Sequence, residues 1–199
     1  LSEPESPYAN TKLMGEQILR DFSKVNPDFK IVSLRYFNPV GAHESGLIGE
    51  SPINKPNNIL PVICNSAETG EEMMVFGGDY DTRDGSCIRD YVHVSDIAEA
   101  HVKAFEYLIS DKSLSYDVYN LGLGIGNRFE NQGLTVLEVI KSFEKVNNVK
   151  VNYKIGLRRE GDIVEIYSNS TKARKIGWKP TRTVDDMVSS AWKWHKNKI

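Results

Sequence analysis

Apolar residues recur along the first part of the chain at the spacing of a helix and then of a strand. Between residues 8 and 25 they fall three or four positions apart, with charged residues between them, which predicts an amphipathic helix. Residues 30–37 are rich in branched and aromatic side chains, which is typical of a strand buried on both faces. The apolar positions behind these predictions are Met14, Ile18, Phe22 and Val25 in the helix and Ile31, Val32 and Leu34 in the strand.

Strands and helices are predicted to alternate through the rest of the chain. We expect helices near 59–70, 96–108, 134–146, 171–176 and 184–196, strands near 73–76, 88–94, 117–121 and 149–155, and loops at 38–56, 77–86 and 122–133. Asn57 is expected to cap the first of these helices. The alternation indicates an α/β fold. A loop as long as 38–56 is usually functional.

Composition narrows the class of protein without identifying it. The 199 residues are 40% hydrophobic and 26% charged, as in ordinary globular domains, and the formal net charge is −2. This balance gives no reason to expect nucleic acid or a membrane as a partner. The two cysteines, Cys64 and Cys87, argue against a disulfide framework and favour a reducing, cytoplasmic location. No spacing of histidines, cysteines or carboxylates indicates a metal site.

Tyr8 and Lys12 are the first candidates for catalysis. They stand four positions apart at the start of the first predicted helix, so that both side chains share one face. A free tyrosine titrates near about 10, and a neighbouring cation favours its ionised form. Such a phenolate is a usable proton acceptor. The pattern is weak by itself, because many helices show a tyrosine and a lysine at this spacing.

The glycines at 122, 124 and 126 imitate a dinucleotide-binding turn, since they follow a predicted strand. Asn127 stands where the third glycine should be, and the next helix begins several residues later. We therefore interpret the run as an ordinary turn. The chain then has a candidate base for the nicotinamide side of a cofactor but no convincing loop for its pyrophosphate. One half of a cofactor site is therefore missing, and we expect a piece of a longer protein.

Several longer runs carry a resemblance to a known family. They are Ser6–Lys12, Leu34–His43, Pro56–Pro61, Arg89–Asp96, Tyr119–Gly122 and Arg158–Asp162. In order and spacing they resemble the C-terminal half of the UDP-galactose 4-epimerase family, which belongs to the extended short-chain dehydrogenases/reductases. The tyrosine–lysine pair is shared by that whole superfamily. The Asn-Pro-Val-Gly-Ala-His, Asn-Asn and Arg-Arg-Glu-Gly-Asp runs are more specific to the epimerases.

The resemblance implies an architecture. We expect an α/β chain formed by the C-terminal part of a Rossmann-type parallel sheet and a smaller α/β substrate-binding domain. Residues 1–38 would be the remainder of the NAD-binding domain, whose glycine-rich N-terminal half is absent, and would carry the catalytic helix. Residues 39–199 would mainly form the UDP-sugar-binding domain, with a segment near 88–121 returning to the Rossmann domain.

It also implies roles for particular residues. Tyr8 and Lys12 would be catalytic and would lie with Tyr36 and Pro39 beside the cofactor, NAD. The implied substrate-binding residues are Asn38, Asn58, Ile59, Met74, Phe76, Arg89, Tyr91, Arg159, Asp162 and Ile166. No metal is implied.

The residue types suit these roles. Arginines make bidentate bonds to phosphate, so Arg89 and Arg159 suit the pyrophosphate of a UDP-sugar, although an isolated arginine is usually a solvated surface residue. Asp162 can accept from sugar hydroxyls, and the resemblance suggests the ribose; a simple loop cap is the alternative. Phe76, with Met74 beside it, would lie near the uracil, and a plain core strand is nearly as good an interpretation.

The implied reaction is the NAD-dependent interconversion of UDP-galactose and UDP-glucose. Tyr8 would take the proton of the C4 hydroxyl while the C4 hydride passes to NAD, and the 4-keto sugar would turn and be reduced from its other face. Another nucleotide-sugar epimerase, dehydratase or decarboxylase of the superfamily remains an alternative, as does a binding fragment without catalysis. The piece alone is expected to be inactive or nearly so. Ile166 falls where the family places a gatekeeper for N-acetylated sugars, and a branched aliphatic there leaves that specificity open.

The remaining expectations concern histidines and assembly. His93 is expected to be buried and structural, and His43 to lie in the pocket loop. His101 and His195 are expected to be helical and exposed. The helix face after Tyr8 either contributes to a homodimer or packs within the chain.

Overall fold

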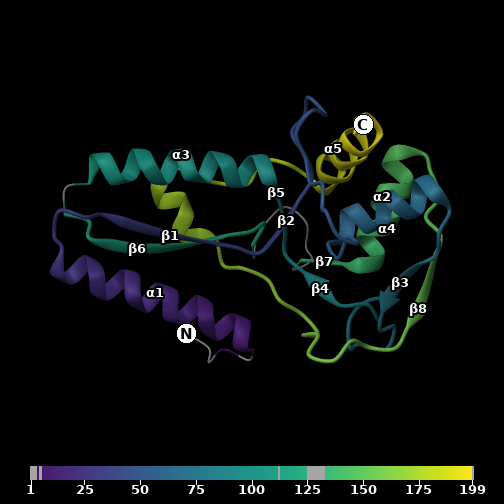
Figure 1. Ribbon diagram of the computed structural model, residues 1–199, viewed down its shortest axis with the longest axis horizontal. Helices are drawn as coiled ribbons and strands as arrows, with labels where there is room; N and C mark the ends of the chain where they lie inside the picture. The colour runs from purple at the N-terminus through teal and green to yellow at the C-terminus, as the bar shows by residue number, and fades with distance from the viewer. Residues whose placement is uncertain (1–3, 5, 112, 125–132, 199) are drawn as a thin grey trace.

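The computed structural model describes residues 4, 6–111, 113–124 and 133–198 and has the α/β architecture predicted from the sequence (Figure 1). Its helices are α1 (Pro7–Val25), α2 (Ile59–Thr69), α3 (Val94–Ser110), α4 (Val136–Asn147) and α5 (Val184–Asn197), with a 3₁₀ helix η1 (Thr171–Ile176). Its strands are β1 (Ile31–Tyr36), β2 (Asn38–Val40), β3 (Met73–Phe76), β4 (Ile88–Arg89), β5 (Tyr91–His93), β6 (Tyr116–Leu121), β7 (Leu134–Thr135) and β8 (Tyr153–Gly156).

The first half of the fold is built on the parallel pair β1 and β6, which α1 and α3 flank on opposite sides (Figure 1). Successive side chains of a strand point to opposite faces. Arg35 accordingly reaches α1, where its guanidinium donates to both carboxylate oxygens of Glu16 at 2.5 Å. The next residue, Tyr36, reaches α3 instead, where its hydroxyl lies 2.8 Å from Nε2 of His101.

One prediction about burial in this half is wrong. Ile31, Val32 and Leu34 are half-buried, whereas a strand covered on both faces would bury them. The apolar stripe of α1 is exposed along its whole length, at Met14, Ile18, Phe22 and Val25. Periodicity correctly predicts which residues share a face of α1, but the described part of the chain does not pack over that face.

The second half of the fold holds three further two-stranded sheets and the helices α2, α4 and α5 (Figure 1). The pairs β2–β5 and β3–β8 are parallel, and β4–β7 is antiparallel. Buried Ile63, Phe143 and Val188 form part of one hydrophobic cluster here. A separate cluster, which includes Tyr119 and Trp178, fills the first half.

Asp90, between β4 and β5, ties distant segments together. Its side chain is 1% exposed and accepts hydrogen bonds from the backbone amides of Leu123 (2.7 Å), Gly124 (3.2 Å) and Ser168 (2.8 Å) and from the Ser168 hydroxyl (2.5 Å). A Cβ at Gly122 would lie 2.3 Å from Asp90 Oδ2, so only glycine fits there. The glycines of 122–124 thus close a turn around a carboxylate, as predicted. The rest of that motif, at residues 125–132, lies outside the described residues.

Several predicted boundaries need correction. β2 lies inside the predicted loop 38–56, because Asn38 donates its amide to the Asp90 carbonyl at 2.9 Å and so extends the ladder to β5. β8 begins at Tyr153, four residues later than expected at 149. The N-cap of α2 is Asn58 rather than Asn57.

The start of α3 also differs, since the helix begins at Val94 rather than at Asp96. His93 caps it by accepting the Ser95 amide on Nδ1 at 3.0 Å. The Asp96 carboxylate, fully buried, instead accepts from the Arg182 guanidinium at 2.6 Å and from the Thr181 hydroxyl at 2.9 Å. The Asp96 carboxylate thus makes tertiary contacts, and the His93 imidazole caps the helix.

Candidate functional site

Tyr8 and Lys12 lie together in the first turns of α1. Ser6 begins the helix by accepting the Ala9 amide at 3.1 Å, and Pro7 fits the first helical position because it needs no amide partner there. The Lys12 ammonium lies 5.0 Å from the centre of the Tyr8 ring, so the two side chains converge as their spacing predicts. The Tyr8 side chain is 70% exposed.

The position of this pair in the fold follows from the connection between α1 and β1. A short turn reverses the chain, so the N-terminal end of α1 lies at the carboxyl end of β1 (Figure 1). Ligands of open α/β sheets bind outside the carboxyl ends of the parallel strands. Tyr8 and Lys12 are therefore at the end of the sheet where a ligand is expected.

A cavity of 570 Å³ contains the sugar-side residues predicted from the sequence. Its lining includes Asn38, Pro39, Asn58, Ile59 and Tyr91. The parallel register of β2 and β5 sets Asn38 opposite Tyr91, which brings together residues about fifty positions apart. Burial raises the pKa of the Tyr91 phenol above its usual value, so this hydroxyl stays protonated. His43 lines the same cavity, as expected for a residue of the pocket loop.

The nucleotide-side residues form a second group around one carboxylate. Asp162 Oδ1 lies 3.3 Å from Arg89 Nη2, and Asp162 Oδ2 lies 3.4 Å from Arg159 Nε. The Arg159 guanidinium also covers the Phe76 ring, and its Cζ atom lies 4.7 Å from the ring centre. Residues from three separate segments thus converge as predicted, with one more positive than negative charge. Such a cluster attracts a phosphate and offers an aromatic face to a base.

Met74 and Ile166 lie at the edges of this second group. Met74 shares the exposed face of β3 with Phe76, since both alternate with buried neighbours. Ile166 follows the loop that carries Asp162 and donates its amide to the Ile88 carbonyl at 3.2 Å, next to Arg89. Its side chain is exposed.

None of the cofactor-side residues Tyr8, Lys12 and Tyr36 is part of the lining of the 570 Å³ cavity, and Tyr36 also lies apart from the other two. Its ring packs against His101 on α3, on the opposite face of the sheet from α1 and Tyr8. His101 is exposed and helical, as expected. His93 is buried and hydrogen-bonded, which confirms its structural interpretation.

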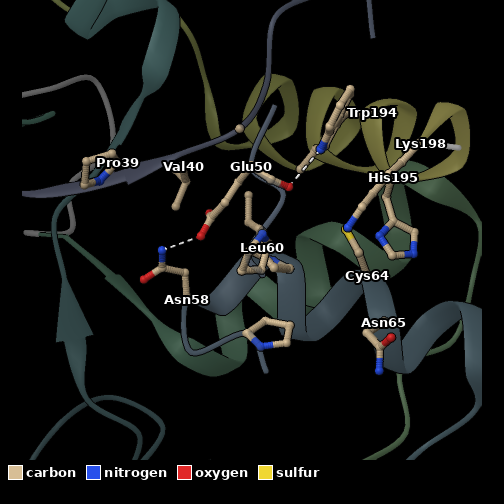
Figure 2. Close-up of a pocket in the computed structure, with 15 residues that line it drawn as sticks. Pro39, Val40, Glu50, Asn58, Leu60, Cys64, Asn65, Trp194, His195 and Lys198 are labelled. Carbon is tan, nitrogen blue, oxygen red and sulfur yellow. Dashed lines mark hydrogen bonds between the residues drawn. The ribbon is translucent and has the colours of Figure 1, made fainter. Parts of the chain in front are cut away.

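A smaller cavity of 190 Å³ adjoins the first and contains residues that sequence reasoning missed (Figure 2). Pro39, Glu50 and Asn58 line both cavities. His195 lines the smaller one; it is half-buried, stacked on Trp192 and 2.7 Å from Glu68, so the expectation that it is exposed is wrong. No spacing or motif in the sequence identifies Glu50, because its partner Asn58 is eight positions away in the same irregular connection.

Two other classes of site were searched for across the described ranges. In them, no three histidine, cysteine, aspartate or glutamate side chains are placed to hold a metal ion. Nor do these ranges contain a helix with the length and apolar character needed to cross a membrane.

Comparison with models of protein families identifies the family of this chain. The family model described as GDP-mannose 4,6 dehydratase matches residues 2–191, nearly the whole chain. The chain belongs to this dehydratase family.

Within the dehydratase family, the chain is similar to proteins named as epimerases. The chain is 47% identical over 191 residues to UDP-glucose 4-epimerase of Erwinia amylovora, which covers 95% of this chain and 54% of that protein. It is 46% identical over 195 residues to bifunctional UDP-glucose 4-epimerase and UDP-xylose 4-epimerase 1 of Pisum sativum, covering 96% of this chain and 53% of that protein. The chain thus spans about half the length of the curated relatives it matches and corresponds to their C-terminal part.

Solved structures agree with this placement in the family. UDP-glucose 4-epimerase of Stenotrophomonas maltophila, with bound NAD and formylated UDP-arabinopyranose, superposes with a TM-score of 0.89 at 42% identity, over 98% of this chain and 56% of that one. The enzyme of Bifidobacterium longum, in complex with NAD+ and UDP, gives 0.87 at 46% identity, over 97% and 55%. The resemblance to the C-terminal half of the epimerases and the expected Rossmann-type fold class are confirmed.

Proposed function

We propose that this protein interconverts UDP-galactose and UDP-glucose with NAD as its cofactor, by oxidation and re-reduction at C4 of the hexose. The observation that carries the proposal is the pairing of Tyr8 with Lys12, 5.0 Å apart, at the carboxyl end of the parallel strands. A phenol beside a cation at that place is suited to removing a hydroxyl proton. The similarity to named epimerases supports the same reading.

The two groups of ligand-binding residues divide the substrate between them. Arg89 and Arg159 would bind the pyrophosphate of UDP, with Phe76 beside the uracil, because charge and stacking suit those parts. Asn38 and Asn58 line the 570 Å³ cavity and would meet the hexose. This arrangement holds the nucleotide by charge and leaves the hexose with weaker contacts, so that the sugar can turn between the two halves of the reaction.

The residues present fit one end of the proposed cofactor. The exposed Lys12 ammonium, one helical turn from Tyr8, is suited to donating to the ribose next to a nicotinamide. When bound, NAD supplies a reversible acceptor for the hydride of C4. Tyr8 takes the C4 hydroxyl proton during oxidation and returns a proton to the same oxygen once the sugar has presented its other face. Lys12 places its positive charge beside the Tyr8 ring, 5.0 Å from the ring centre.

A 4,6-dehydratase is the second candidate, because the matching family model carries that description. It would share the oxidation at C4 but would then eliminate water. Mass spectrometry of the product distinguishes the two directly, since an epimerase leaves the mass of the nucleotide sugar unchanged and a dehydratase lowers it by one water.

The test is turnover of UDP-galactose by the natural full-length form of the protein, since the named epimerases are almost twice as long as this chain. Tyr8→Phe removes only the proton-accepting oxygen, so we expect UDP binding to persist and turnover to fall by about 10²-fold or more. Tyr116→Phe is the matched control, because Tyr116 lies at the amino end of β6 and bonds Ser33 at 3.1 Å. Equal turnover of the Tyr8→Phe variant and the unaltered protein would refute the proposal.

We also propose the division into two domains given above, supported by the two separate hydrophobic clusters. The exposed apolar stripe of α1 is consistent with a contact to a second copy or to a further part of a longer chain. Analytical ultracentrifugation of the full-length protein tests the first of these.

A further inference from the structure

Glu50 lies at the wall shared by the two cavities and bonds a residue that faces the proposed hexose position. Asn58 donates its side-chain amide nitrogen to Glu50 Oε1 at 2.6 Å (Figure 2). An ionised carboxylate can only accept hydrogen bonds. Asn58 must therefore turn its NH₂ group toward Glu50 and its oxygen away. Figure 2 shows that oxygen on the side of Asn58 remote from Glu50.

The start of α2 gives a second, independent observation: the Asn58 side chain does not cap the helix. Asn58 is the N-cap residue of α2, a position where an asparagine oxygen ordinarily accepts an amide of the first turn. Its side chain makes no such bond to α2, all of whose residues the structure describes. The helix thus lacks a side-chain cap, and the Asn58 oxygen is not used by the first turn of α2.

Glu50 itself is held in place from α5. Trp194 Nε1 donates to the Glu50 carbonyl at 2.9 Å (Figure 2), and Lys193 Nζ donates to the Glu44 carbonyl at 2.7 Å. A Cβ at Gly49 would lie 2.4 Å from the Trp194 ring, so the loop packs directly on that indole. One face of α5 therefore fixes the loop 44–50 and, through it, the Glu50 side chain.

We infer that Glu50 is a positioning residue for sugar recognition: it orients the Asn58 carboxamide so that its oxygen accepts a hydroxyl of the bound hexose. This inference rests on the proposed function and adds a specificity element to it. An amide held in this orientation favours a donor, such as a sugar hydroxyl, over an acceptor such as a phosphate oxygen. In this role Glu50 acts through its hydrogen bond from Asn58.

The test uses the full-length protein. Calorimetry compares its affinity for UDP-galactose with its affinity for UDP, and steady-state kinetics give KM and kcat for UDP-galactose. Glu50→Gln keeps the size of the side chain but can donate as well as accept, so the bias on Asn58 is lost. We expect kcat/KM for UDP-galactose to fall roughly three- to tenfold, mainly through KM, as for one misaligned exposed hydrogen bond. Affinity for UDP should not change. Glu106→Gln, at an exposed pair with Lys103 on α3, removes the same charge and should have no effect.

Two further variants keep the inference falsifiable. Asn58→Ala should lower sugar affinity, and adding Glu50→Gln to it should cause no further loss, because both act on one contact. Trp194→Phe keeps the ring on Gly49 but removes the Nε1 donor, and it should act in the same direction without any change in charge.

Each outcome bears on one claim. Additive losses, unchanged sugar affinity in Glu50→Gln, or an equal loss of UDP affinity would overturn the role of Glu50. If the unaltered protein binds UDP-galactose without converting it, the proposed reaction fails. The calorimetric comparison would still decide the orientation of Asn58.

Discussion

Asp90→Asn tests whether the carboxylate that joins four donors is a main determinant of stability. One oxygen, Oδ2, accepts from the Gly124 amide and from both the amide and the hydroxyl of Ser168, while Oδ1 accepts from the Leu123 amide. Asparagine has almost the same shape, but one of its two terminal groups is a donor. At least one buried N–H must then face an NH₂ group.

The expected loss follows from these four bonds. In the least damaging orientation the new NH₂ faces Leu123, which leaves one buried donor unsatisfied at a cost of about 1–3 kcal/mol. The three bonds at the other oxygen become neutral and lose about 1 kcal/mol each. Relief from burying a charge offsets part of this sum. We therefore expect the free energy of unfolding to fall by roughly 3 kcal/mol, which lowers Tm by about 6–12 °C for a chain of this size.

Urea titration and calorimetry measure this change, and Asp185→Asn provides the control. Asp185 is exposed and accepts a single bond from Ser142 at 2.9 Å, so its replacement should alter stability by less than about 0.5 kcal/mol. Hydrogen exchange gives a local readout, because the amides of Leu123 and Gly124 should lose protection in Asp90→Asn. A loss below about 1 kcal/mol, with those amides still protected, would refute the reasoning.

Three further predictions concern other buried groups. Burial lowers the pKa of His93 in the folded protein, so the imidazole binds a proton more readily once the chain unfolds. The free energy of unfolding should therefore fall as the pH drops below about 6.5, by at most about 1.4 kcal/mol per pH unit. Urea titrations of His93→Gln should lack this pH dependence. Burial raises the pKa of Cys64 to about 12 and that of Cys87 above its usual value, so neither should react with iodoacetamide at pH 8 until urea unfolds the chain. Phe143→Ala, at a fully buried position, should cost about 3–5 kcal/mol in urea titration.

Each of these has a contrary outcome. A stability profile that is the same with and without the His93 imidazole would place its titration elsewhere. Rapid labelling of either cysteine in the folded protein would contradict its burial. A loss below about 1 kcal/mol for Phe143→Ala, with Phe105→Ala on the exposed face of α3 as the control, would mean that the core around Phe143 is not packed as described.

The sequence predicts those parts of the fold and site that depend on local pattern. The helix from Pro7 to Val25 follows from apolar spacing, and the strand Met73–Phe76 from its short apolar run. The convergence of Tyr8 and Lys12 is a local helical property, which is why spacing alone predicts it. The arginine cluster was anticipated only through resemblance, because its members come from separate segments.

What the sequence could not supply depends on contacts between distant residues. β2 was hidden in a predicted loop, because a three-residue strand is recognised by its partner, β5, some fifty positions later. The exposure of the α1 stripe likewise depends on what packs against it and not on its own periodicity. The bond from Asn58 to Glu50 joins two loop residues that no periodic pattern relates.

The shared carboxylate of Asp162 has a consequence for how an anion would be captured. Two long guanidinium side chains, which otherwise sample many rotamers, are already restrained by one counter-ion at 3.3 and 3.4 Å. The two side chains thus lose conformational entropy when the chain folds, so that less is lost when a diphosphate binds. If the cluster binds the nucleotide as proposed, neutralising Asp162 would free both guanidinium groups and weaken that binding, even though it removes a negative charge near a negative ligand.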